Sequence, residues 1–155
     1  MARPVDRRRS PARVGHLEMP IDVVDHAADR VACAMVAAVA CPTDPRTLAE
    51  WSGHVGVSRG AVRAWCAAAH VQARACLDFV RVLRAVYLSD GQAWDLHGFL
   101  NVVDARSLSR LLARGALTDC LRRPHAPSVE EFLTTQRFVT KRAILRAVSA
   151  RLPKR

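Results

Sequence analysis

The segment 48–66, LAEWSGHVGVSRGAVRAWC, constrains the fold of this chain more strongly than any other stretch. Its apolar residues follow the spacing of two helices joined by a short turn. A small residue falls where the helices cross, and a glycine, which adopts a positive φ without steric cost, falls at the turn. The pattern predicts a helix-turn-helix unit, whose second helix has the shape that enters the major groove of DNA. The apolar positions are Trp51, Val55, Val57, Val62 and Trp65, with Ser52 at the crossing and Gly56 at the turn.

A second stretch, residues 96–112, repeats this pattern with one more residue in the turn region. Asn101 falls where Gly56 falls in the first unit, and asparagine also tolerates the left-handed conformation. Between the two units, residues 74–88 carry apolar side chains at helical spacing with no Pro or Gly, which predicts one connecting helix. The apolar positions of the second unit are Leu96, Leu100, Val102, Leu108 and Leu112.

This order of elements resembles the DNA-binding domain of the AraC/XylS-type bacterial transcription regulators. The resemblance covers about residues 46–116 and is carried by the first unit and the connecting helix. In the second unit, His97 stands where the family prefers alanine and Asn101-Val102 where it prefers Gly-Phe. The matching residues are Gly56, Val57, Ser58 and Val62 in the first unit, with Ser52 in the alanine position, and Arg81, Val82 and Ala85 in the connecting helix.

The resemblance implies a bacterial, cytoplasmic and nucleoid-associated regulator that is not an enzyme. Its partners would be double-stranded DNA and RNA polymerase, which it would recruit or block. In the family, each recognition helix enters its own major-groove segment on one face of the DNA. The alternative is an all-α protein-interaction or dimerisation module whose second helix-turn-helix has lost its DNA contact.

The second helix of each unit carries the candidate DNA contacts. Arg59 and Arg63 are four residues apart and therefore project from one side of their helix. One guanidinium can bind guanine O6 and N7 while the other binds a phosphate. Gly60 weakens the helix, and we interpret it as a point of close approach to DNA. The predicted contacts are Ser58, Arg59, Gly60, Arg63 and Ala64 in the first unit, and Arg106, Ser107, Ser109, Arg110 and Arg114 in the second.

Composition and charge agree with these predictions. Half of the 155 residues are hydrophobic and 5% are aromatic, a mixture that favours closely packed helices. No stretch alternates polar and β-branched residues as a strand does. We therefore expect an all-α chain with extra helices at both ends of the double unit. The net charge of +10 favours a polyanionic partner, chiefly nucleic acid, but does not by itself distinguish DNA from RNA or an anionic membrane.

We divide the chain into four expected regions: a disordered basic tail over 1–20, an N-terminal helix over 21–41, the DNA-binding domain that the resemblance implies over 46–116, and a basic helical extension over 117–155. The apolar stripe of 21–40 either packs on the domain core or forms a homodimer. Its continuous apolar run is shorter than the roughly 20 residues that a bilayer requires, so we expect no membrane span.

Local signals predict where two helices begin. Thr43 or Asp44 is expected to cap a short helix, and Ser128 and Glu131 have the spacing of a capping box. The C-terminal helix that follows has a kink or a second start near Thr134 and Phe138. Its arginines either contact DNA backbone or form a solvated face.

No catalytic or cofactor motif accompanies these patterns. The odd number of cysteines disfavours disulfides. Cys66, His70 and Cys76 lie within 11 residues, but there is no CxxC pair or fourth ligand, and core packing is the favoured interpretation over zinc or a redox-sensing thiol. We expect no enzyme activity, no cofactor and no metal.

Overall fold

The computed structural model describes residues 21–89, 96–114, 125–135 and 142–153. Within these ranges the chain forms α-helices and no strand, which confirms the predicted all-α fold. The predicted basic tail over 1–20 lies outside the described residues, as do 115–124 and 136–141. The helices are α1 Ile21–Ala40, α2 Leu48–Val55, α3 Arg59–Ala68, α4 Ala73–Ser89, α5 Leu96–Leu100, α6 Ala105–Arg114, α7 Val129–Thr135 and α8 Arg142–Arg151.

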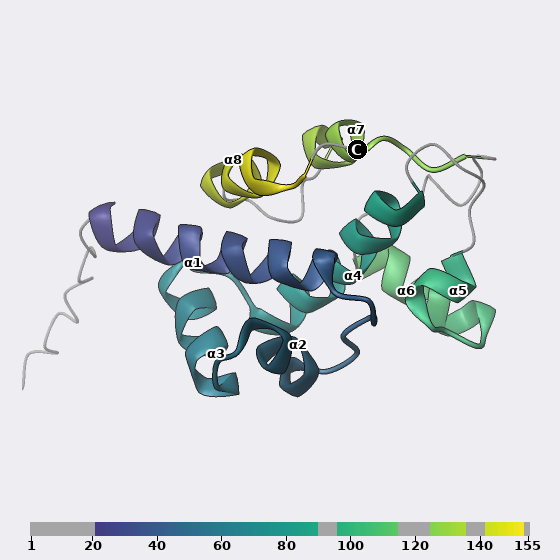
Figure 1. Ribbon diagram of the computed structural model, residues 1–155, viewed down its shortest axis with the longest axis horizontal. Coiled ribbons are helices and arrows are strands. Elements are labelled where there is room, and N and C mark those ends of the chain that lie inside the picture. The colour runs from purple at the N-terminus through teal and green to yellow at the C-terminus, as the bar shows by residue number, and fades with distance from the viewer. Residues whose placement is uncertain (1–20, 90–95, 115–124, 136–141, 154–155) are drawn as a thin grey trace, which may run out of the picture.

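Helix α1 lies between two groups of helices. Figure 1 shows α8 on one side of it and α2 and α3 on the other, and α1 contacts all three. Alanines such as Ala32, Ala34 and Ala38 are fully buried, and their small side chains let neighbouring helices approach closely. On one side, Trp51 of α2 donates a hydrogen bond from Nε1 to the Ala34 carbonyl oxygen at 2.9 Å. From Ala28 to Val39, the predicted stripe of α1 thus packs on the core of its own chain.

Helix α4 is the connecting helix predicted over 74–88, and it extends one residue further at each end. Every side chain from Cys76 to Val86 is buried, because α1, α2, α3, α5, α6 and α7 all contact this helix. Phe79 stacks on Phe132 of α7, with ring centroids 5.5 Å apart. Helix α4 is therefore the centre of the core that joins the two predicted units.

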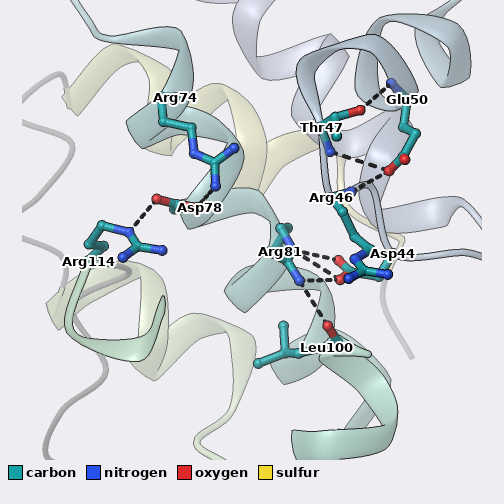
Figure 2. A network of polar contacts seen from close by, with 9 residues as sticks. All are labelled: Asp44, Arg46, Thr47, Glu50, Arg74, Asp78, Arg81, Leu100 and Arg114. Atoms are coloured by element: carbon teal, nitrogen blue, oxygen red, sulfur yellow. Dashed lines mark hydrogen bonds and ion pairs between the residues drawn. The ribbon is translucent and has the colours of Figure 1, made fainter. Parts of the chain in front are cut away.

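The start of α2 corrects one sequence prediction. Neither Thr43 nor Asp44 caps the helix; Thr47 does. The Thr47 hydroxyl accepts a hydrogen bond from the Glu50 amide at 3.2 Å, and the Glu50 carboxylate accepts one from the Thr47 amide at 3.3 Å (Figure 2). This reciprocal capping box satisfies amides that the first helical turn leaves free. Asp44 instead binds Arg81.

The C-terminal extension contains two helices in the described residues, α7 and α8, where the sequence predicted one helix with a kink or a second start. At the start of α7, the Ser128 hydroxyl accepts a hydrogen bond from the Glu131 amide at 3.1 Å, which is one half of the predicted capping box. Ile144 and Val148 of α8 are fully buried, so this helix belongs to the same core as α1 and α4.

Candidate nucleic-acid interface

Gly56, at the turn between α2 and α3, has the left-handed conformation that the sequence predicts. Gly56 adopts a φ of 74°, in the left-handed region. Its amide donates to the Gly53 carbonyl at 3.1 Å, and the Val57 amide donates to the Ser52 carbonyl at 3.0 Å, which ends α2. Ser58 then caps α3, because its hydroxyl accepts a hydrogen bond from the Ala61 amide at 3.1 Å. Three residues therefore suffice to redirect the chain from α2 into α3.

Helix α3 has one buried and one exposed face. Val62 and Cys66 are 1% exposed. The predicted contacts lie on the other face: Ser58, Arg59, Gly60, Arg63 and Ala64 are all exposed. A Cβ added to Gly60 would have Ser58 Oγ as its nearest neighbour at 3.7 Å, an ordinary contact. Packing inside the chain therefore does not require glycine at this position.

The second pair, α5 and α6, repeats this division. Asn101 has a φ of 45°, the left-handed conformation expected for it. Leu108, Leu111 and Leu112 bury one face of α6. The predicted contacts on the opposite face are exposed: Arg106, Ser107, Ser109, Arg110 and Arg114.

Asp104, which the sequence did not single out, lies at the start of α6. Its Oδ1 accepts a hydrogen bond from the Ser107 amide at 2.7 Å. This bond and others from nearby backbone stabilise the carboxylate and lower the pKa of Asp104 below its ordinary value of 3.8. A negative charge therefore accompanies the arginines at this end of the helix. The sequence pattern that indicates Asp104 as the N-cap of α6 is Asp-x-x-Ser followed by an apolar stripe.

Arg114 is the one predicted arginine contact that forms an ion pair within the described residues. Its Nε donates to Oδ2 of Asp78 at 2.6 Å, and Arg74 lies 3.6 Å from Oδ1 of the same carboxylate (Figure 2). Asp78 is a buried residue of α4. The ion pair thus joins the end of α6 to the connecting helix. By contrast, no carboxylate in the described part of the chain forms an ion pair with Arg59, Arg63, Arg106 or Arg110.

A second polar cluster joins the two helix pairs. Arg81 of α4 donates to Oδ2 of Asp44 from Nε at 2.9 Å and from Nη2 at 2.6 Å, and its Nη2 also donates to the Leu100 carbonyl at 2.8 Å (Figure 2). Both charged side chains are less than a tenth exposed. Burial raises the pKa of Asp44, while the hydrogen bonds from Arg81 act in the opposite direction. The segment before α2 and the end of α5 are therefore held by one guanidinium.

Arg84, one turn further along α4, extends this connection. It donates to the carbonyl oxygens of Cys41 at 3.1 Å, Pro42 at 2.7 Å and Phe99 at 3.2 Å. Burial lowers the pKa of Arg84. The signal for both residues was present in the sequence as two arginines inside an otherwise apolar run, because buried charges need partners.

Cys66 and Cys76 are buried in the core, as their spacing predicts. The neighbouring Cys66 thiol and burial both raise the pKa of Cys76. Cys66, His70 and Cys76 do not converge on a metal site, and no group of three or more such residues does so in the described ranges. None of the helices found there is long and apolar enough to cross a membrane.

Comparisons of the chain with protein-family models, with curated proteins and with solved structures found no match. The candidate interface is therefore defined by its own geometry. It consists of two short helices, α3 and α6, each capped at its start and each carrying exposed arginines opposite a buried apolar face.

Proposed function

We propose that this chain binds double-stranded DNA through α3 and α6 and acts as a sequence-specific transcription regulator. One observation carries the proposal: Arg59, Arg63, Arg106 and Arg110 are exposed on helices whose other face is fixed in the core, and no described carboxylate pairs with them. Arginines placed in this way are available to an anionic partner, and their planar guanidinium groups match guanine edges and phosphates.

Of the two helices, α3 is expected to make the stronger contact with DNA. Arg59 and Arg63 are one turn apart at the N-terminal end of the helix, the end that contacts base edges when such a helix enters the major groove. Gly60 lies between them with no side chain to hold a phosphate or base at a distance. Helix α6 offers Arg106 and Arg110 in the same relation, but Asp104 disfavours a phosphate close to its first turn.

The length of α4 is compatible with two contacts in one duplex. Its 17 residues span about 26 Å at 1.5 Å per residue. With the widths of the flanking helices, this length allows α3 and α6 to reach major-groove segments about 34 Å apart, one turn of DNA. Asp44, Arg81 and Leu100 tie the two helix pairs together, which favours a fixed spacing over independent motion.

The test is selection of binding sites from a genomic duplex library with the full chain. We expect a sequence motif with two halves about 10 base pairs apart. Changing Arg59 or Arg63 to Ala is expected to weaken binding by about 1–3 kcal/mol and to relax specificity in one half only. Binding is measured by fluorescence anisotropy across a salt series.

Helix α8 supplies a matched control. Arg142 and Arg146 are also exposed and four residues apart, but α8 lies on the side of α1 opposite α3 (Figure 1). Replacement of either one by Ala removes the same single charge as Arg59→Ala or Arg63→Ala, and it is expected to leave specificity unchanged. Equal losses from both pairs on every sequence would contradict the assignment of α3. A library that yields no motif would favour the interaction module, which sedimentation of the free chain would then reveal as a dimer.

A further inference from the structure

Val103, in the turn between α5 and α6, is the one large hydrophobic residue that is exposed among those the structure describes. It is 95% exposed. Its neighbour Val102 is partly buried and packs against the core. The chain therefore presents an isolated apolar side chain directly before the residue that caps α6.

The position of Val103 follows from the difference between the two turns. In the first turn, Val57 follows the left-handed Gly56, and Ser58 caps α3 at once. In the second turn, Val102 follows the left-handed Asn101 in the same way, but the capping residue is Asp104. Val103 is thus the additional residue, and its side chain lies outside the core.

The chemistry around Val103 limits what it can meet in a DNA complex. Asp104, next to it, is held as a carboxylate and disfavours a phosphate at this point. Arg106, on the face assigned to DNA, lies two residues after Asp104, and Arg110 lies one turn further along α6. The base edges in the major groove carry one apolar group, the C5-methyl of thymine.

We propose that Val103 contacts the C5-methyl group of a thymine in the half-site bound by α6. This inference rests on the proposed function. It makes the added residue of the second turn a specificity-determining residue, and it assigns to the second half-site an apolar contact where the first relies on arginine.

The experiment uses the full chain and the duplex selected for it. Each thymine is replaced in turn by uracil, which removes only the methyl group. At one position in the second half, we expect the wild-type chain to lose about three- to tenfold in affinity, as for removal of one buried methyl. The Val103→Ser variant is expected to bind the two duplexes equally.

Two controls separate the possible failures. A uracil in the first half-site must affect the wild-type chain and the Val103→Ser variant by the same factor. Because Val103 is exposed, the variant must also unfold at the wild-type temperature. Equal affinity of the wild-type chain for thymine and uracil throughout the second half would overturn the inference and leave the proposed function intact. Failure to select any duplex would instead overturn the proposed function.

Discussion

Two residues with positive φ determine where α2 and α5 end. Gly56 at 74° and Asn101 at 45° occupy the left-handed region, which costs other residues roughly 1–2 kcal/mol. Both positions could be predicted from the sequence, because glycine and asparagine are the residue types that adopt this conformation most readily. His70, with a φ of 55°, was not predicted, although histidine is, with asparagine and aspartate, among the non-glycine residues enriched at positive φ.

Replacement of Gly56 by Ala is expected to lower the free energy of unfolding by about 1–2 kcal/mol. A Cβ at Gly56 would meet nothing within 4 Å, so the cost is conformational and not a clash. Gly53 provides the control, because it lies within α2 and its Cβ would also meet open space. Its replacement by Ala is expected to stabilise the chain by up to about 1 kcal/mol. Urea titrations measure the free energy of unfolding of both variants. A change of the same sign in both would contradict a conformational origin of the cost at Gly56.

Asp104 makes the stability of α6 depend on pH. Its pKa lies below 3.8 in the folded chain because the Ser107 amide stabilises the carboxylate. A lowered pKa means that its contribution is complete above pH 3.8 and is lost as the pH falls through the folded value. The difference in melting temperature between the wild-type chain and Asp104→Ala is therefore expected to narrow in acid. A difference that stays constant from pH 6 to pH 3 would show that the charge of Asp104 contributes nothing.

At the scale of elements, the helices themselves were predictable and their polar connections were not. Apolar spacing located α1 and α4 to within a residue, because one face or all faces of a helix must avoid water. Arg81 pairs with Asp44, 37 residues away, and Asp78 pairs with Arg114, 36 residues away. A single sequence shows that such charges are buried in a helix, but it does not show which distant group neutralises them.

Removal of only one partner of the Asp44–Arg81 pair is expected to lower the free energy of unfolding strongly. Changing Arg81 to Met leaves the Asp44 carboxylate and the Leu100 carbonyl buried without their donor, and should cost about 3–5 kcal/mol. The double change Asp44→Leu with Arg81→Met should recover most of this loss, because it removes both charges together. A double-mutant cycle in guanidinium chloride measures the coupling, and strictly additive effects would rule out the pair as a structural connection.

At the scale of the whole molecule, one continuous core includes residues from all eight described helices. The sequence predicted the double unit and its extensions as separate regions. It could not predict that α8 packs on α1, since residues more than 100 positions apart are joined only by folding. A destabilising substitution in α8 is therefore expected to destabilise α3 as well, because α1 contacts both helices.

Replacement of the fully buried Ile144 by Ala is expected to lower the free energy of unfolding by about 2–5 kcal/mol. Because α1 contacts both α8 and α3, amide hydrogen exchange should accelerate in α3 as much as in α8. Ser149→Ala, at an exposed position of the same helix, serves as the control. It should change neither the free energy of unfolding nor the rate of hydrogen exchange. Faster exchange confined to α8 would show that this helix opens independently of the rest.

The double coverage of α1 also has a consequence for synthesis. Helix α1 is translated before every other described helix, yet part of its surface packs against α8, the last of them. That part of the surface of α1 stays exposed to water until residues 142–152 have been translated. A nascent chain that pauses before residues 142–152 would expose an alanine- and valine-rich surface to chaperones. Completion of the fold therefore depends on α8.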